Sequence, residues 1–250
     1  SRGGRGRRRT WRAAAGVVML IVDRVNSSYG RSHVLHDVSL RVEPGEVVVL
    51  LGRNGAGKTT TMASVVGFVR TRSGTIRLGS ERIDRLSPYK RVRAGLGYVP
   101  QSGRVFAGLT VLENLEMVRG RAASNGDGYS VERVFGLFPK LADLAARDAG
   151  HLSGGERQML AVARALMANP AIVLFDEPSE GLAPVVVERL GELIAGLRGA
   201  GVGVLLAEQN HRFALRLADR GYFIEKGQIR HHGGGEDLSR SDVLERFLGV

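Results

Sequence analysis

Apolar and polar residues alternate in two early stretches of the chain, MLIVDRV and VLHDVSLRV (residues 19–25 and 34–42). Such alternation is typical of strands with one face buried and the other in water, so it predicts half-buried antiparallel strands. A different pattern follows the turn EPGE, where five apolar residues run without interruption from Val47 to Leu51. This continuous run predicts a strand that is buried on both faces.

Two more buried strands are predicted later in the chain. The run AIVLF (171–175) ends in the carboxylates Asp176 and Glu177 before a proline stops it. The run GVGVLLA (201–207) ends in three polar residues, EQN (208–210). Because buried strands of a parallel sheet carry ligand groups at their carboxyl ends, we expect both polar endings to face a ligand.

The stretch HLSGGERQMLAVARALMANP (151–170) has helical spacing. Ser153 is a good helix cap with Glu156 in the first turn, and Asn169–Pro170 ends the helix. One apolar face is expected to point into the core; it consists of Met159, Val162, Ala163 and Leu166.

These patterns predict an α/β chain. Residues 19 to about 95 should form an antiparallel β portion and the front of the α/β core, and residues from about 102 to 157 should be mostly helical. After them, alternating strands and helices are typical of a mainly parallel sheet. A final amphipathic helix is predicted within GGGEDLSRSDVLERFLGV.

The net charge of +11 is concentrated at the start of the chain. Six arginines and no acid occur in SRGGRGRRRTWR, a Gly/Arg composition that cannot bury a core, so we expect residues 1–18 to be a disordered basic extension or upstream sequence before Met19. The longest apolar run, residues 13–22, is about half a membrane span. No cysteine is present, which fits a reducing compartment, and the six histidines lack ligand-like spacing.

The first buried strand leads directly into GRNGAGKTT, which fits the pattern G-x-x-x-x-G-K-[ST] between a strand and a helix. Glycines let the backbone wrap around phosphates, and the N–H groups at the following helix start attract anions. Lys58 would reach the terminal phosphates, and Thr59 would offer its hydroxyl to Mg²⁺. The predicted nucleotide-binding residues are Gly52, Asn54, Gly55, Ala56, Gly57, Lys58, Thr59 and Thr60.

The carboxylates after the second buried strand supply what a phosphate site still needs. Asp176 can hold Mg²⁺ through water, and Glu177 should point the other way by strand alternation, where it can polarise an attacking water. Gly154 and Gly155 would form a second anion site at a helix start, one able to act on a nucleotide held by another copy. Together these features predict nucleotide hydrolysis.

The motif LSGGE at 152–156, a phosphate loop about a hundred residues earlier and IVLFDEP shortly after resemble the ATP-binding cassette ATPases from Met19 to Val250. The resemblance implies one ATPase domain (19–250), with a P-loop NTPase core, a mainly parallel sheet, an antiparallel β subdomain and a helical subdomain at about 102–157. It also implies a head-to-tail dimer that encloses two ATP molecules, each between one phosphate loop and the partner's LSGGE. Further roles that it implies are adenine stacking by Tyr29, Mg²⁺ contact by Gln101, and nucleotide contacts by Ser153, Gly154, Gly155 and Glu156.

Several segments, including DEPSEGLAP, QMLA and AEQN, look like the ATPase subunits of branched-chain amino-acid importers. That resemblance implies two membrane permeases, a second ATPase, an indirect solute-binding protein and a peripheral position at the cytoplasmic face of the cell membrane. The urea and short-chain amide importers are an alternative, favoured by LLGRNG, YVPQ and Glu180. A soluble ATPase acting on nucleic acid is a third interpretation, but it usually has a coiled coil or a second cassette.

Two positions depart from many relatives. Ala183 stands where many cassettes have an aspartate, and Gln209 stands where many have a histidine that contacts the γ-phosphate. Glutamine can donate a hydrogen bond but has no proton-transfer role near neutral pH. We therefore expect Gln209 to position or sense the γ-phosphate while Glu177 remains the main catalytic carboxylate.

Overall fold

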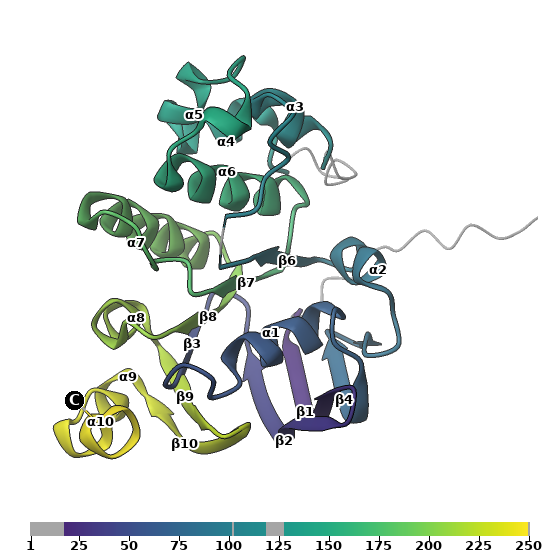
Figure 1. Cartoon of the computed structure of the whole chain (residues 1–250), viewed down its shortest axis with the longest axis vertical. Helices are drawn as coiled ribbons and strands as arrows, with labels where there is room; N and C mark the ends of the chain where they lie inside the picture. The colour runs from purple at the N-terminus through teal and green to yellow at the C-terminus, as the bar shows by residue number, and fades with distance from the viewer. Residues whose placement is uncertain (1–17, 102, 119–127, 250) are drawn as a thin grey trace, which may run out of the picture.

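The computed structural model describes residues 18–101, 103–118 and 128–249 (Figure 1). The predicted extension over residues 1–18 lies almost entirely outside the described residues, as does most of the loop RGRAASNGDG. Two sheets organise the described part of the chain, one of four strands and one of six. None of its helices is long and apolar enough to span a membrane.

The four-stranded sheet is antiparallel and has the order β2-β1-β4-β5. Its first two strands cover the alternating segments, and Leu20, Val22 and Leu40 are buried while Ile21 and Arg41 are more exposed. The predicted half-buried strands are therefore confirmed. Their bounds are β1 Leu20–Tyr29, β2 Ser32–Val42, β4 Thr71–Leu78 and β5 Glu81–Arg82.

The six-stranded sheet has the order β10-β9-β3-β8-β7-β6, and only β10 is antiparallel to its neighbour. The three strands predicted from continuous apolar runs, β3, β7 and β8, lie side by side in its middle and are buried throughout. The bounds are β3 Val47–Leu51, β6 Leu96–Val99, β7 Ile172–Asp176, β8 Gly203–Glu208, β9 Arg220–Glu225 and β10 Gln228–Gly234. The predicted fold class, an α/β core with a mainly parallel sheet, is confirmed.

Side chains alternate across the six-stranded sheet, so its two faces pack against different partners. Val49, Phe175 and Leu206 belong to a core shared with α6 (Gly154–Met167), α7 (Pro184–Gly199) and α8 (His211–Leu217). Residues of the opposite face belong to a core shared with α1 (Lys58–Val66) and the antiparallel sheet. Helices α1 and α6 therefore lie on opposite faces of the sheet (Figure 1).

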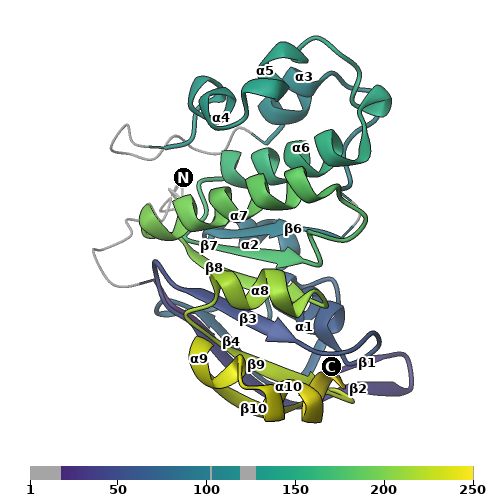
Figure 2. The ribbon, with the colours of Figure 1, turned by 90° about the vertical axis from the view of Figure 1, so that its left-hand side faces the viewer.

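Short helices lie beyond α6, on its side away from the sheet (Figure 2). The helical structure is interrupted at Phe138, which has φ −128° and ψ 68°, because a helical backbone there would clash with the ring of Pro139. The bounds are α3 Val111–Glu116, α4 Val131–Leu137, α5 Pro139–Asp143 and a 3₁₀ turn at Ala149–His151.

The buried Arg91 fixes the end of α1. It lies on α2 (Pro88–Arg93), is 2% exposed, and its guanidinium donates to the carbonyls of Ser64 and Val65 at 2.8 and 2.7 Å. These carbonyls belong to the last turn of α1, where positive charge is favoured by the helix dipole. The helix that begins at the phosphate loop is thus anchored at its far end.

The chain ends in α9 (Gly235–Leu238) and the predicted amphipathic helix α10 (Ser241–Leu248), which packs Phe247 on Phe223 of β9. His231 of β10 is half-buried, because it stacks on Phe247 and contacts Asp237 at 2.7 Å. Within the described residues, no group of three or more histidine, aspartate or glutamate side chains is arranged so that it could hold a metal ion.

Candidate functional site

The polar strand endings meet at one edge of the six-stranded sheet. Leu51, the last residue of β3, pairs with Glu208 at the end of β8, and Asp176 at the end of β7 pairs with Ala207. Since β3, β7 and β8 are parallel, the phosphate loop and both polar endings follow at the same edge. This geometry places the candidate groups next to one another.

The loop from Gly52 to Gly57 needs glycine at particular positions. A Cβ on Gly52 would lie 2.4 Å from the carbonyl oxygen of Ile224, and Gly57 has a φ of 115°, which side chains rarely tolerate. Gly57 is also the cap residue of α1 and offers no side-chain hydrogen bond to it. The first N–H groups of α1 are therefore left for an anion.

Lys58 is folded into this loop and is 3% exposed. Its Nζ donates to the carbonyl oxygens of Gly52 and Arg53 at 2.7 and 3.2 Å, and it lies 3.0 Å from Oε1 of Glu177. Neither Lys58 nor Glu177 has much access to water, so the positive charge of one balances the buried negative charge of the other. One cation thus joins the phosphate loop to the ending of β7.

Thr59 and Asp176 form the next contact. The Thr59 hydroxyl donates to Oδ1 of Asp176 at 3.1 Å, and the Tyr98 hydroxyl donates to Oδ2 at 3.2 Å. Burial raises the pKa of Asp176, against the hydrogen bonds from Thr59 and Tyr98 and the charge of Lys58, which lower it. Hydroxyl and carboxylate oxygens are the ligands that Mg²⁺ prefers, so these two side chains fit that ion.

Glu177 follows immediately but is not part of the strand. Its φ is 47°, in the left-handed region, and its N–H donates to the carbonyl of Ala207 at 2.9 Å. The expectation that strand alternation turns Glu177 away from Asp176 is therefore wrong. A sharp backbone turn at a non-glycine residue sets its direction, and such strain is often found at functional sites.

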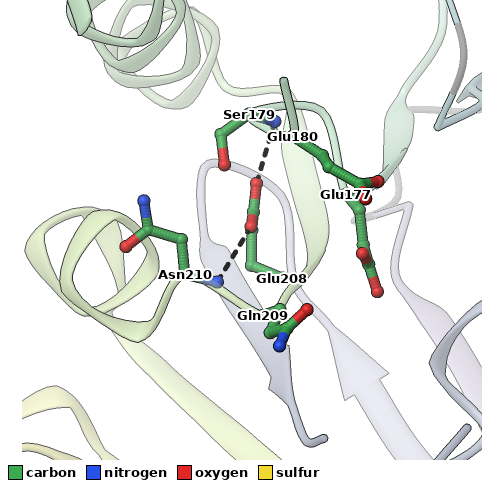
Figure 3. Close-up of a pocket in the computed structure, with 6 residues that line it drawn as sticks. All are labelled: Glu177, Ser179, Glu180, Glu208, Gln209 and Asn210. Atoms are coloured by element: carbon green, nitrogen blue, oxygen red, sulfur yellow. Dashed lines mark hydrogen bonds between the residues drawn. The ribbon is translucent and has the colours of Figure 1, made fainter. Parts of the chain in front are cut away.

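A pocket of about 280 Å³ opens beside this turn (Figure 3). It lies between the loop after β7 and the loop after β8, at the same sheet edge as Lys58. Each residue that lines it has a polar side chain; these residues are Glu177, Ser179, Glu180, Glu208, Gln209 and Asn210.

Glu208 and Gln209 differ in role although they are adjacent. The carboxylate of Glu208, 2% exposed, accepts hydrogen bonds from the N–H groups of Ser179 and Asn210 at 3.0 and 3.2 Å. Burial raises the pKa of Glu208 despite these bonds. Gln209 is exposed and leaves the strand end in a different direction (Figure 3). Glu208 therefore ties two loops together, and Gln209 is accessible from the pocket.

Gln101 also reaches this region. It lies two residues beyond Val99 of β6, which pairs with Phe175, and its Nε2 donates to Oε2 of Glu180. Tyr29, at the end of β1, is 53% exposed, so its ring is available for stacking. Asn54 and Gly55 in the phosphate loop are exposed, whereas Ala56 and Thr60 are buried. The roles of these residues toward a nucleotide stay predictions.

The second glycine-rich helix start is not brought to the phosphate loop. Ser153 and Glu156 cap each other at the start of α6: the Ser153 hydroxyl accepts from the Glu156 N–H at 3.3 Å, and the Glu156 carboxylate accepts from the Ser153 N–H at 2.8 Å. The hydrogen bond from the Ser153 backbone lowers the pKa of Glu156. Gly154 is exposed, and Gly155 approaches Val186 of α7. One chain therefore holds these two anion sites apart.

Comparison with known families decides what this arrangement is. The family model described as "ABC transporter" matches residues 35–180, which contain the phosphate loop, the start of α6 and the ending of β7. The chain belongs to the ABC transporter family, as one of its ATPases. The predicted resemblance and the predicted ATP hydrolysis are thereby confirmed.

Several proteins are similar to this ABC ATPase over nearly their whole length. The high-affinity branched-chain amino acid transport ATP-binding protein BraG of Pseudomonas aeruginosa is 44% identical over 92% of this chain and 100% of its own. The lipopolysaccharide export system ATP-binding protein LptB of Haemophilus influenzae is 38% identical over 92% and 97%. A probable branched-chain amino acid transport protein, LivF of Archaeoglobus fulgidus, is 34% identical over 93% and 99%.

Solved structures agree with the fold of this ABC ATPase. A nucleotide-free ATP-binding cassette from an ABC transporter has a TM-score of 0.77 at 28% identity and covers 92% of this chain and 98% of its own. An ATP-binding cassette of an ABC transporter in its ADP conformation has a TM-score of 0.78 at 29% identity, over 94% and 99%.

Sequence reasoning missed two contributors to the site of this ABC ATPase: Tyr98, which donates to Asp176, and Glu180, which accepts from Gln101. Glu208 was expected to face a ligand with the rest of its polar strand ending. It is instead buried and ties two loops together, because a buried carboxylate needs hydrogen-bond partners. The contacts of Tyr98 and Glu180 join segments far apart in the sequence, and no local pattern predicts them.

Proposed function

We propose that this ABC ATPase energises an importer of branched-chain amino acids. The observation that carries the proposal is the 44% identity to BraG over the whole length of that protein. The identity to LivF supports it as well. The sequence AEQN, with glutamine at position 209, is a second support, because it is one of the segments that resemble this type of importer.

The phosphate loop is proposed to hold ATP through its backbone. The free N–H groups at the start of α1 would bind the phosphate oxygens, and the Lys58 ammonium would bind the terminal phosphates. Thr59 and Asp176, with Gln101, would hold Mg²⁺, which neutralises phosphate charge when it is bound. Tyr29 would stack on the adenine ring.

Binding of a phosphate at Lys58 would change the environment of Glu177. The ammonium now lies 3.0 Å from the Glu177 carboxylate, and a phosphate oxygen would compete for that contact. Glu177 released from the pair could accept a proton from an attacking water. The Gln209 amide, which is exposed in the pocket, would donate a hydrogen bond to the γ-phosphate.

A second ATPase would complete the site. Ser153, Gly154, Gly155 and Glu156 of one subunit would face the nucleotide held by the phosphate loop of the other, as in a head-to-tail dimer. The proposed partners are a second ABC ATPase, either a paralogue or another copy, two membrane permeases and, indirectly, a solute-binding protein. Such an assembly would place this chain at the cytoplasmic face of the membrane as a peripheral subunit.

Glu177→Gln tests the hydrolytic part of this proposal. The amide keeps the shape of the carboxylate but cannot accept a proton, so ATP turnover should fall about 100-fold or more while ATP still binds. Size-exclusion chromatography should then show an ATP-stabilised dimer. Turnover at the wild-type rate would remove Glu177 from the mechanism, and loss of nucleotide binding would contradict a role confined to hydrolysis.

The solute is tested by reconstituting the ATPase with its copurifying permeases and binding protein in liposomes. Leucine should stimulate ATP turnover and accumulate inside. Stimulation by urea instead would support an importer of urea and short-chain amides, the alternative that Glu180 favours. Stimulation by lipopolysaccharide would support a function in lipopolysaccharide export, as the name of LptB states for that protein. Stimulation by RNA alone would overturn the transport proposal.

A further inference from the structure

Glu180 and Gln101 form a contact between two loops that are distant in the sequence. Gln101 follows β6, and Glu180 follows the turn at Glu177; the Gln101 Nε2 donates to the Glu180 Oε2. Both side chains are exposed, and Glu180 lines the pocket beside Glu177. This contact with Gln101 is the contribution of Glu180 to the site.

The chemistry of this contact fixes the direction of an amide. An ionised carboxylate only accepts hydrogen bonds, so the nitrogen end of the Gln101 amide must face Glu180. The oxygen end is then directed away from Glu180. An exposed glutamine without such a partner can turn its amide over and present either end to a neighbouring ligand.

The amide oxygen is the end that a magnesium ion requires. Mg²⁺ takes oxygen ligands, whereas an amide nitrogen would present its hydrogens to the ion. The oxygen pair of Thr59 and Asp176 lies at the end of β7, the strand that pairs with β6, and Tyr98 of β6 donates to Asp176 at 3.2 Å. Strand β6 therefore brings Gln101 toward a group of oxygens suited to the ion.

We propose that Glu180 is a positioning residue, which holds the nitrogen of Gln101 so that the amide oxygen faces the Mg²⁺ of the nucleotide. Partners of this kind, which orient a metal ligand without touching the metal, commonly change metal affinity 10- to 100-fold when removed. The inference rests on the proposed ATP and Mg²⁺ site and adds to it a residue that selects one of two amide orientations.

The test measures the affinity for Mn²⁺, used as a probe in place of Mg²⁺, in the full-length protein with saturating ADP. Electron paramagnetic resonance of free Mn²⁺ gives the dissociation constant without turnover. Glu180→Leu removes the acceptor and should weaken Mn²⁺ binding about tenfold. The matched control is Glu192→Leu, an exposed glutamate on α7, which should bind Mn²⁺ like the wild type.

A double-mutant cycle separates positioning from simple charge attraction. If Glu180 acts through Gln101, Glu180→Leu should cause no further loss in a Gln101→Ala background. An undiminished loss in that background would overturn the proposal, because Glu180 would then act as a charge alone. An unchanged Mn²⁺ affinity in Glu180→Leu would also overturn it.

The failure of the proposed site can be distinguished from the failure of this inference. Wild-type protein that binds neither ADP nor Mn²⁺ would overturn both. Wild-type protein that binds both, with Glu180→Leu indistinguishable from it, would leave the nucleotide site intact and overturn only the role of Glu180. Circular dichroism of each variant confirms that the fold is retained, as expected for an exposed side chain.

Discussion

Two helices of this protein begin next to glycines, and their starts are built differently. Helix α1 follows Gly57, which is left-handed and provides no side-chain cap, whereas α6 follows Ser153, which is locked in a capping box with Glu156. At α1 the first N–H groups are open. At α6 the capping box uses the N–H groups of Ser153 and Glu156 but not those of Gly154 and Gly155.

The surroundings of the two helix starts differ even more. The start of α1 faces side chains of its own chain: Lys58 is inside the loop, and Asp176 and Glu177 lie against it. The start of α6 lies across the sheet and has an exposed glycine, Gly154. These surroundings support the proposal that the start of α1 holds a phosphate group and that the start of α6 completes a site on another subunit.

The largest effect is expected at the first helix start. Lys58→Met keeps the length of the side chain but removes its charge, so ATP turnover should fall by more than about 100-fold. The measurement is steady-state phosphate release, with nucleotide affinity from equilibrium titration. Lys90→Met, which removes an exposed lysine on α2, should leave both unchanged.

Loss of Lys58 also leaves Glu177 as a buried carboxylate without its cation. The double variant Lys58→Met/Glu177→Gln removes that unpaired charge and should recover stability in urea denaturation without recovering nucleotide binding. Recovery of binding in the double variant would mean that Lys58 acts only by balancing Glu177.

The second helix start should respond in a different manner. Gly154→Asp places a negative charge where a phosphate from another subunit is expected, so turnover should fall about 100-fold. Nucleotide binding by the isolated chain should be unchanged. The fold tolerates the change, since a Cβ at Gly154 has no atom within 4 Å and acids are favourable at helix starts. Wild-type turnover in Gly154→Asp would contradict the contrast between the two starts.

Substituting alanine for Gly57 and for Gly154 compares the two helix starts by the free energy of unfolding. At Gly57 it would meet a φ of 115° and side-chain carbons of Ile224 and Leu35 at 3.2 Å, so we expect a loss of about 1–3 kcal/mol. At Gly154 it meets open space, and the effect should be within about 0.5 kcal/mol or favourable. Urea denaturation of both variants gives these values. Equal losses would contradict the assigned backbone constraint.

The smallest expected effect is a change in stability with pH, and it concerns the loop after β7, which lies between the two helix starts. The loop after β7 runs from Glu177 to α7, whose Val186 lies near Gly155. Within this loop, the N–H of Ser179 donates a hydrogen bond to the carboxylate of Glu208. Burial raises the pKa of Glu208 above 4.5, so between 4.5 and that raised pKa the folded chain keeps a proton that the unfolded chain has lost. The free energy of unfolding therefore falls as pH rises through this window.

Glu208→Gln removes this titration. The unfolding free energy of the wild type minus that of the variant should decrease as the pH rises above 4.5, because the wild type alone incurs the buried charge. Asp176, whose pKa burial also raises, is present in both proteins and cancels in the difference. Urea denaturation across this pH range checks the prediction. Parallel pH profiles for the two proteins would show that Glu208 does not titrate as its burial implies.

The sequence was sufficient for the features that depend on local pattern. Continuous apolar runs identified β3, β7 and β8, because a buried strand needs only neighbouring residues to be recognised. The phosphate-loop motif pointed to Lys58 and Thr59, which the structure places against Glu177 and Asp176, while their roles toward a nucleotide stay predictions. The capping box of Ser153 and Glu156 is local as well. These predictions succeeded where chemistry and spacing act within one turn or one strand.

Features that depend on tertiary structure could not be read in the same way. Glu177 lies in a left-handed turn outside the strand, so strand alternation could not predict the direction of its side chain. The pair of Gln101 and Glu180 and the bond from Tyr98 to Asp176 arise from the neighbouring positions of β6 and β7. Only the assembled sheet brings these groups together.

The central claim is that the two helix starts complete one another only between subunits. Mixing Lys58→Met chains with Gly154→Asp chains tests it most directly, since each is inactive alone but a mixed head-to-tail dimer has one intact composite site. We predict that an equal mixture regains about a quarter of wild-type ATP turnover, because half of the dimers are mixed and each has one of two sites. Turnover that stays at the level of the separate variants, although mixed dimers form, would contradict the account.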